Sequence, residues 1–213
     1  MDGNGRWAEK RKHQRLWGHI RGSSVVSKIV EEAQTCNIRA LTFYAFSTEN
    51  WYRPSSEINV LFNLLQKYLI REEQRILKNN IRFRIMGEIK TLPAGIQKSI
   101  IRLEDLTKSM TGLKLTFAFS HGGRNEIVWA ANNFMKKNPG VPLTLQSFSQ
   151  SLMIPDLGDV DLLIRTGGDF RISNFLLWQS AYAELYFTST KWPDFGSKEF
   201  RRICEKVQTR ERR

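Results

Sequence analysis

The chain has 213 residues, of which 41% are hydrophobic, and this suits one globular domain over residues 1–213 with a substantial core. Its 33 Lys and Arg against 21 Asp and Glu give a net charge of +12, which indicates an anionic partner or substrate: nucleic acid, a phosphorylated metabolite or an acidic membrane surface. The two cysteines, Cys36 and Cys204, exclude a disulfide framework and a structural zinc site, and no apolar run approaches the roughly 20 residues that cross a bilayer.

Four short apolar runs predict β-strands, each ending at a polar or glycine-containing turn. The runs are 40–46, 81–86, 113–119 and 160–164. Segments with helical apolar spacing lie before and between them. These segments are 25–33, 58–77, 96–110 and 127–134. Strands that alternate with helices predict an α/β fold with a mainly parallel central sheet flanked by helices.

The predicted helix from Ile58 to Leu77 is apolar around more than one face. The residues off its main stripe are Val60, Leu64, Tyr68 and Ile70. Two interpretations stay open for the second face: burial between the sheet and a partner helix, or the wall of a hydrophobic tunnel. The segment 96–110 offers a second wall, which core packing explains equally well.

The first six residues combine an acid, two glycines, an amide and an arginine, directly before a helix-compatible segment. These residues are Asp2, Gly3, Asn4, Gly5 and Arg6. Glycines let backbone N–H groups approach an anion closely, and an arginine supplies a forked charge suited to phosphate. A surface turn with a nearby arginine is an equally good interpretation. Arg15 and His19 follow at a spacing that places them on one helical face.

Polar residues with arginines follow three of the predicted strands. They are the stretches 47–53 (STENWYR), 120–124 (SHGGR) and 165–173 (RTGGDFRIS). Ligands of open α/β sheets bind outside the carboxyl ends of strands, so these arginines predict a shared polyanion site. The two arginine clusters, Arg6/Arg15/Arg53 and Arg165/Arg171, suggest two phosphate-bearing groups. His121 alone is more typical of a structural histidine.

Glu184 stands among apolar and aromatic neighbours in the string AYAELYF. A buried carboxylate needs a partner, and both an internal ion pair and a Mg²⁺ ion satisfy this need. Mg²⁺ commonly takes one or two carboxylates together with substrate phosphates. Asp2 and Glu184 could supply these carboxylates if they meet in space.

Six strings in the chain, in this order and spacing, resemble the cis-prenyltransferase family, and within it the bacterial undecaprenyl diphosphate synthases. The strings are DGNGRWA, RLWGHIRG, YAFSTENWYRP, GGR, DLLIRTGGDFRISNFLLWQ and AYAELYF. The resemblance spans essentially the whole chain. It implies Mg²⁺-dependent condensation of isopentenyl diphosphate onto an allylic diphosphate, usually farnesyl diphosphate, with each new double bond in cis. The product would be a long polyprenyl diphosphate, a cell wall lipid carrier, in an apolar tunnel, which favours the tunnel interpretation of 58–77.

The resemblance also implies roles for individual residues. Asp2 would bind Mg²⁺ and orient diphosphate, with Glu184 as the second carboxylate near the metal. Asn50 would help the proton loss that ends each condensation, although an amide is a poor base. The residues implied to bind the two substrates are Gly3, Asn4, Gly5, Arg6, Trp7, Arg15, His19, Ser47, Thr48, Glu49, Trp51, Arg53, Arg165, Arg171, Ile172 and Ser173.

The chain departs from the family pattern in several places. Ser120 and His121 replace the usual Asn-Tyr, Asp169 replaces a longer Glu, and Phe170 stands where a polar residue is common. We expect these changes to reduce or retune activity without abolishing it. The family also places an apolar strand directly before the DGNGRW loop, so we expect a sheet without this first strand and a less firmly held Asp2.

By the same resemblance, the protein is expected to be a cytoplasmic homodimer that makes peripheral contact with the inner face of the membrane during product release. Two rival functions are a non-catalytic prenyltransferase-like partner subunit and a basic nucleic-acid-binding protein. The retained Asp2, Arg165, Arg171 and Ser173 argue against the first rival. Arginines that cluster at glycine turns, and not in one exposed stripe, argue against a nucleic-acid partner. The absence of DDxxD motifs disfavours a trans-prenyltransferase.

Overall fold

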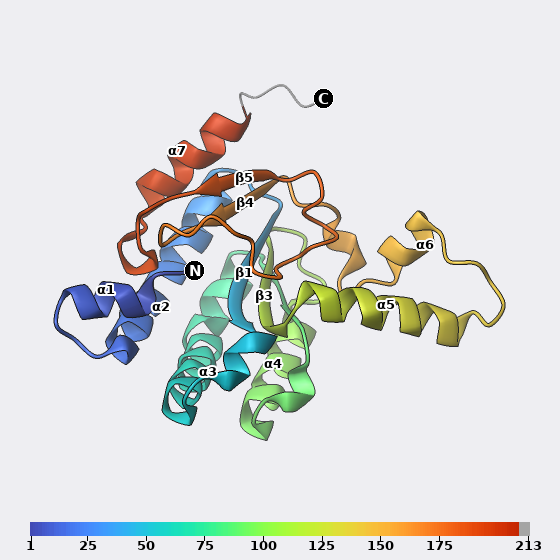
Figure 1. Cartoon of the computed structure of the whole chain (residues 1–213), viewed down its shortest axis with the longest axis horizontal. Coiled ribbons are helices and arrows are strands. Elements are labelled where there is room, and N and C mark those ends of the chain that lie inside the picture. The colour runs from blue at the N-terminus through green and yellow to red at the C-terminus, as the bar shows by residue number, and fades with distance from the viewer. Residues whose placement is uncertain (209–213) are drawn as a thin grey trace.

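The computed structural model describes residues 1–208, in which helices surround two small parallel sheets (Figure 1). The helices are α1 (Asn4–Lys10), α2 (Arg15–Thr35), α3 (Ser55–Lys78), α4 (Ala94–Thr107), α5 (Gly123–Lys137), α6 (Leu145–Gln150) and α7 (Ser197–Gln208). The strands are β1 (Ala40–Ser47), β2 (Arg82–Met86), β3 (Lys114–His121), β4 (Leu162–Arg165) and β5 (Glu184–Phe187). Short 3₁₀ helices are η1 (Thr48–Tyr52), η2 (Ile89–Thr91), η3 (Pro155–Leu157) and η4 (Trp192–Asp194).

All strand pairs are parallel, which confirms the predicted parallel arrangement. The larger sheet has the order β1-β3-β2, and both Ala40 and Arg82 lie opposite Lys114, so its three strands begin level. The smaller sheet pairs β4 with β5. The four predicted strands correspond to β1 through β4. No prediction covers β5, because a four-residue strand that begins with a glutamate lacks a long apolar run.

The sheet is divided between β1 and β4. Among the described residues, β1 pairs with β3 alone and β4 pairs with β5 alone. Residues of both facing strands, such as Phe43 and Leu163, line one cavity of about 2220 Å³. The candidate site lies in this cavity, which is lined by residues of both sheets.

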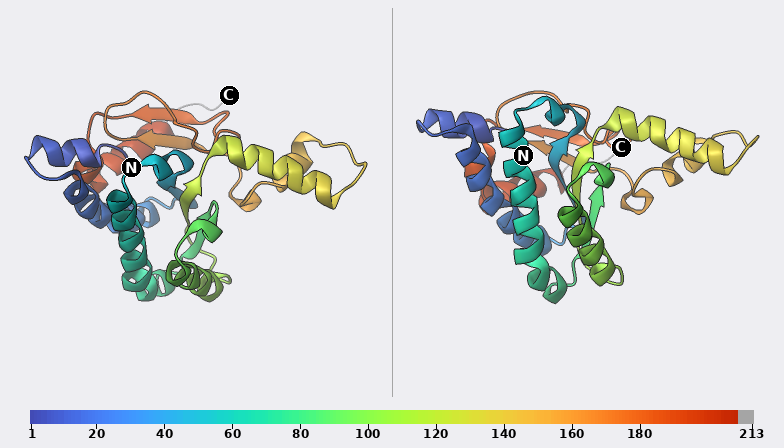
Figure 2. Two further views of the ribbon diagram at one scale, coloured as in Figure 1. Left: turned by 60° about the horizontal axis from the view of Figure 1, so that its bottom comes forward. Right: turned by 90° about the horizontal axis from the view of Figure 1, so that it is seen from below.

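Helices α3 and α4 lie side by side on one side of the larger sheet (Figures 1 and 2). The predicted stripe of α3 is buried at Ile58, Phe62 and Leu69, as the helical spacing requires. Leu61 of this stripe, together with Leu64 and Tyr68 off it, lines the cavity, so α3 faces both the core and the cavity. Ile96, Ile100 and Leu103 of α4 lie in the core, Ile101 and Leu106 are exposed, and no residue of α4 lines the cavity. The second wall predicted for 96–110 is therefore core packing.

Strand β2 is an edge strand whose outward N–H groups are capped by side chains of α4. The Phe83 N–H donates to Thr107 Oγ1 (3.1 Å), and the Ile85 N–H donates to Glu104 Oε1 (2.9 Å). These side chains take the place of a neighbouring strand and leave few free groups for edge-to-edge association. Burial raises the pKa of the Glu104 carboxyl.

We expect Thr107→Val to lower the free energy of unfolding by about 1–3 kcal/mol, because valine keeps the shape but leaves the buried Phe83 N–H without an acceptor. Chemical denaturation measures the loss. Thr35→Val is the matched control, since Thr35 is exposed and its hydroxyl donates to the Glu31 carbonyl within α2. Equal losses in the two variants would contradict the capping role.

Candidate active site

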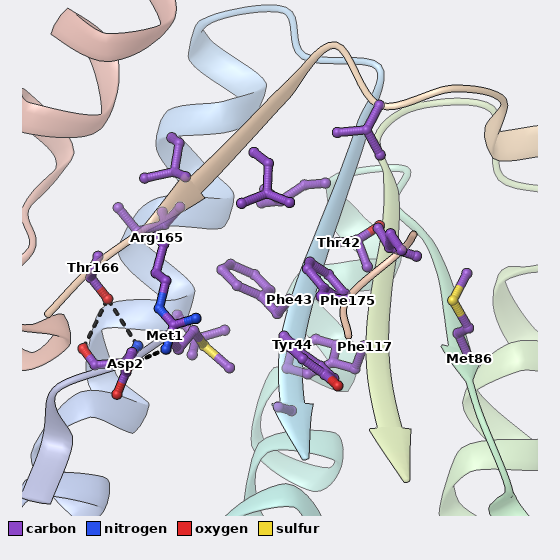
Figure 3. A pocket seen from close by; sticks show the side chains of 18 of the residues that line it. Met1, Asp2, Thr42, Phe43, Tyr44, Met86, Phe117, Arg165, Thr166 and Phe175 are labelled. Atoms are coloured by element: carbon purple, nitrogen blue, oxygen red, sulfur yellow. Dashed lines mark hydrogen bonds and ion pairs between the residues drawn. The ribbon is translucent and has the colours of Figure 1, made fainter. Parts of the chain in front are cut away.

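The loop that begins with Asp2 is bound to the carboxyl end of β4. The Asp2 N–H donates to Thr166 Oγ1 (2.9 Å), and the Thr166 hydroxyl donates to the Asp2 carbonyl (2.9 Å) (Figure 3). The Asp2 carboxylate accepts from the Gly3 N–H (2.6 Å) and from Arg165 Nη2 (2.8 Å). Burial favours the neutral acid, but the hydrogen bonds from Arg165 and Gly3 outweigh it and lower the pKa of Asp2 below its usual 3.8. The carboxylate is therefore charged at neutral pH.

Helix α1 docks tightly on α2. A Cβ atom at Gly18 would lie 1.9 Å from the Asn4 carbonyl oxygen, so only glycine permits this approach. Gly5 lies against the Arg15 guanidinium in the same way. This close packing accounts for the glycines at positions 5 and 18.

Trp7 lies between the two helices. It is buried and stacks on Trp17, with ring centroids 5.1 Å apart, and the Arg11 guanidinium covers its ring at 4.1 Å. Trp7 does not line the cavity. The structure thus places this predicted substrate-binding residue in the packing of α1 on α2.

Arg165 is the centre of the polar end of the site. Its Nη1 donates to Ser173 Oγ (2.7 Å) and to the backbone carbonyl of Arg171. Its Nη2 donates to Asp2 Oδ2 (2.8 Å) and lies 3.4 Å from Asp169 Oδ2. Only 13% of its side chain is exposed. A planar fork with several N–H donors matches this set of acceptors better than a point charge would.

The Asp169 carboxylate forms ion pairs with three guanidinium groups. Its carboxylate lies 2.8 Å from Arg171 Nη2, 3.3 Å from Arg6 Nη2 and 3.4 Å from Arg165 Nη2. Together with Asp2, the cluster holds three positive and two negative charges, so one positive charge is in excess. Such a cluster can exchange carboxylate contacts for the more highly charged oxygens of a diphosphate.

The loop after β1 is held by its own side chains. The Ser47 N–H donates to Asn50 Oδ1 (3.1 Å), so the Asn50 amide caps η1. Glu49 accepts from Thr48 Oγ1 (3.1 Å) and from Asn174 Nδ2 (2.9 Å). Burial raises the pKa of Glu49, but the hydrogen bonds, first that from Asn174, bring it below its usual 4.5. Asn50 therefore has a visible structural role that fits its poor basicity.

His19 joins α2 to the start of α3 through a shared carboxylate. Its Nε2 lies 3.2 Å from Glu57 Oε1, and Arg53 Nη1 pairs with the same oxygen at 2.5 Å. Burial lowers the pKa of His19 and outweighs the opposing charge of Glu57. His19 and Arg53 thus enter the cavity as one preorganised group, as the sequence predicts for two residues of one site.

These groups lie along one large cavity of about 2220 Å³. Figure 3 shows Asp2, Thr166 and Arg165 at its polar end and the aromatic rings of Phe43 and Phe117 farther in. The cavity therefore joins a cationic end to an apolar interior. Of the predicted site residues, all line this cavity except Gly3, Gly5, Trp7, Thr48, Trp51 and Glu184.

Glu184 does not meet Asp2 within the described chain. It begins β5 opposite Leu162, three residues before Arg165 on β4, which places it about 10 Å along the strand from the arginine cluster. Residues 1–208 contain no group of three or more acidic, histidine or cysteine side chains able to hold a metal ion by themselves. The charged carboxylate of Asp2 does fit a Mg²⁺ ion that takes its other ligands from substrate phosphates.

Thr166 and Asp169 lie in the stretch 165–173 that predicts the anion site, but no role is predicted for their side chains, and Asn174 lies one residue beyond that stretch. Each acts on a residue that is distant in the chain, as in the contact between Asp2 and Thr166, which are 164 positions apart. The only available signal was their place directly after a predicted strand.

Comparison with known proteins places this α/β fold and its anion site in one enzyme family. A family model described as putative undecaprenyl diphosphate synthase matches residues 1–213. The isoprenyl transferase of Fusobacterium nucleatum is 46% identical over 100% of this chain and 92% of that relative. The ditrans,polycis-undecaprenyl-diphosphate synthase ((2E,6E)-farnesyl-diphosphate specific) of Haemophilus influenzae is 42% identical over 100% of this chain and 91% of its own.

Solved structures agree with this assignment. Lavandulyl diphosphate synthase from Lavandula x intermedia, in complex with dimethylallyl diphosphate, has a TM-score of 0.94 at 30% identity, covering 100% of this chain and 94% of the other. A probable undecaprenyl diphosphate synthase from Campylobacter jejuni has a TM-score of 0.83 at 38% identity, covering 91% of each chain. The fold is that of a prenyl-transferring enzyme. The chain belongs to the cis-prenyltransferase family of undecaprenyl diphosphate synthases. Within residues 1–208, no helix combines the length and apolar character needed to span a membrane.

We expect Arg165→Lys to weaken the binding of inorganic diphosphate by about tenfold or more, because one ammonium group cannot serve the acceptors that the guanidinium fork joins. Isothermal titration calorimetry measures the change. Arg201→Lys is the control, since Arg201 is half exposed, pairs with Glu32 and does not line the cavity. Unchanged affinity for diphosphate in Arg165→Lys would show that the arginine cluster does not bind the anion.

The imidazole of His19 should titrate below the usual 6.5, because burial disfavours its charged form. NMR can follow it among only three histidines. A lowered folded-state pKa means that the stabilising contribution is present above pH 6.5 and is lost as the pH falls through the folded value. Glu57→Gln should lower the pKa further, since the Glu57 charge opposes the shift; a rise in this variant would contradict the assignment.

Proposed function

We propose that the protein condenses isopentenyl diphosphate onto an allylic diphosphate, of which farnesyl diphosphate is the expected starter, and extends the product to a long polyprenyl diphosphate lipid carrier. The observation that carries this proposal is the single cavity in which a cluster of arginines opens onto an apolar interior. The two ends match the two halves of a prenyl diphosphate. Two comparison proteins, named for farnesyl diphosphate specificity and for a dimethylallyl diphosphate complex, also support an allylic substrate.

The arginines hold and neutralise the diphosphates. Arg165 and Arg171, with Ser173, offer donors at one side of the cavity, and Arg15 and Arg53 line another part of it. Their fixed charges stabilise the negative charge that develops on the departing diphosphate. The contacts already present among Arg165, Asp2 and Ser173 keep these donors in place before substrate arrives.

Asp2 is the proposed Mg²⁺ ligand, together with oxygens of the substrate diphosphate. When bound, Mg²⁺ supplies further charge neutralisation on the leaving diphosphate. The lowered pKa of Asp2 keeps its carboxylate ready for a cation at neutral pH. Glu184 as a second ligand stays a prediction, since its position at the start of β5 is distant from Asp2.

The apolar interior accommodates the growing chain and excludes water. Leu61 and Leu64 of α3, with Phe43 of β1 and Phe117 of β3, form its walls. Water exclusion protects the allylic cation that forms when diphosphate leaves. Asn50 acts here as a positional residue, because its side-chain oxygen is engaged by the Ser47 N–H.

Three further expectations stay predictions: a homodimer, a cytoplasmic location and membrane contact during product release. Helix α5 extends away from the body of the molecule (Figure 2), and Val128, Trp129 and Met135 on it are exposed. Exposed apolar groups on one helix are compatible with subunit contact. Sedimentation of the purified protein measures the oligomeric state.

The direct test is incorporation of labelled isopentenyl diphosphate into butanol-extractable lipid, with farnesyl diphosphate as starter. We expect incorporation with Mg²⁺ and none with excess chelator, and the same extract reports product length. A folded wild-type protein that incorporates no label would contradict the proposal and favour a non-catalytic partner subunit.

Asp2→Ala should reduce turnover to below about one-hundredth of the wild-type rate with the fold retained, because it removes the proposed metal ligand and the Arg165 partner. Circular dichroism reports the fold. Asp194→Ala is the control, since Asp194 forms a surface pair with Arg11, and 48% of its side chain is exposed. Near wild-type turnover in Asp2→Ala would exclude the assigned role.

A further inference from the structure

The candidate active site is carried by two sheets that are not hydrogen-bonded to each other among the described residues. Glu49 follows β1 of the larger sheet, whereas Arg165 and Ser173 belong to β4 of the smaller sheet and its following loop. Strand pairing therefore does not set the spacing between these two parts of the site. Contacts between the loops and side chains of the two parts must contribute to it.

Asn174 bridges the two parts. Its Nδ2 donates to Glu49 Oε1 (2.9 Å), and its Oδ1 accepts from the Arg124 N–H (2.9 Å) at the start of α5. Its backbone carbonyl accepts from the Gly123 N–H (2.7 Å). One residue thus contacts the loops after β1 and β3, while its chain neighbour Ser173 contacts Arg165 after β4.

The backbone around Asn174 is held in an unfavourable conformation. Ser173, Asn174 and Leu176 have φ angles of 50°, 62° and 43°, in the left-handed region that non-glycine residues rarely occupy. Phe175 between them stacks on Tyr44 of β1, with ring centroids 4.3 Å apart. Such strain persists only where surrounding contacts determine the conformation, and it is concentrated at functional sites.

The left-handed backbone conformation directs the side chains of Ser173 and Asn174 toward different parts of the site. Ser173 Oγ points to Arg165 (2.7 Å), and the Asn174 amide points to Glu49. The left-handed turn therefore aims one side chain at each part of the site. The Asn174 side chain makes polar contacts with both the β1 loop, through Glu49, and the α5 N-terminus, through Arg124.

We propose that Asn174 is a positioning residue that sets the spacing between the β1 part and the β4 part of the active site. The inference deepens the proposed function and rests on it, because the two parts would hold the two reacting diphosphates. In such a reaction, a displacement of about 1 Å costs on the order of a hundredfold in rate. Asn174 lines the cavity, and its proposed effect on the chemical step acts through its contacts with Glu49 and Arg124.

Two substitutions at Asn174 test this role. Asn174→Gly suits the positive φ angle and removes both side-chain hydrogen bonds. Asn174→Asp keeps an acceptor for the Arg124 N–H but places a second carboxylate against Glu49. Both variants should lower kcat about tenfold or more, with KM for each diphosphate changed by less than about threefold. Thermal unfolding should be affected less in the glycine variant, where loss of strain offsets the lost hydrogen bonds.

A substitution outside Asn174 perturbs the same bridge. A Cβ atom at Gly122 would lie 2.7 Å from Thr48 Oγ1 and 2.8 Å from Asn174 Nδ2, so Gly122→Ala should reproduce the loss of kcat. Gly95→Ala is the matched control, because a Cβ atom there has no neighbour within 4 Å among the described residues. Wild-type kcat in folded Asn174→Gly or Gly122→Ala would overturn the proposal, as would a loss explained wholly by unfolded protein.

Hydrogen exchange gives a readout that does not depend on catalysis. In Asn174→Gly, the amides of residues 47–53 should exchange faster than in the wild type, because the loop after β1 loses its tie to the smaller sheet. Unchanged exchange there would overturn the proposed bridge even if the wild-type protein proved inactive. A wild-type protein that incorporates no isopentenyl diphosphate but shows faster exchange in the variant would contradict the proposed function and support the bridge.

Discussion

The buried fork of Arg165 is the interaction on which the arrangement of the site depends. It joins Asp2, at the start of the chain, to Ser173 and the Arg171 carbonyl, which follow β4. A guanidinium that is only 13% exposed requires such partners, because an unpaired buried charge is strongly unfavourable. Meeting this requirement also places Asp2 and the glycine loop at the mouth of the cavity. The same contacts that stabilise the arginine therefore assemble the anion site.

The divided sheet borders the cavity. Because β1 pairs with β3 and β4 pairs with β5, the facing edges of β1 and β4 border an open space, and they do not border each other. Polar groups collect where the strands end, and apolar side chains such as Phe43 and Leu163 collect along the strands. A prenyl diphosphate has the same division between a charged head and an apolar tail. The fold thus places the charged groups at one end of the cavity and the apolar side chains farther in.

The departures from the family pattern are accommodated by new contacts. Ser120 accepts a hydrogen bond from Trp51 Nε1 (3.0 Å), and His121 Nε2 lies 2.9 Å from the buried Glu126 Oε2. Burial raises the pKa of Glu126, but its bonds with His121 and Gln179 bring it below the usual 4.5, so the carboxylate is charged. The shorter Asp169 still reaches its arginine partners. Phe170 stays exposed on the surface, where it packs against Phe187.

Much of the fold and most of the site follow from the sequence alone. Apolar runs located β1 to β4, helical spacing located the buried stripes of α3 and α4, and glycine-rich turns after strands located the arginines. The spacing of apolar residues and the local composition are properties of short segments. Backbone sterics and burial make such segments adopt strands, helices or turns without reference to distant residues.

Only the tertiary structure decided which distant groups meet. It placed Trp7 between helices, left Glu184 away from Asp2, and gave Asp169 and Asn174 partners on other elements. It also divided the sheet and lined one cavity with residues of both parts. Apart from the packing of Trp7 on Trp17, these outcomes depend on contacts between segments more than a hundred residues apart, for which the order of residues along the chain contains no local signal.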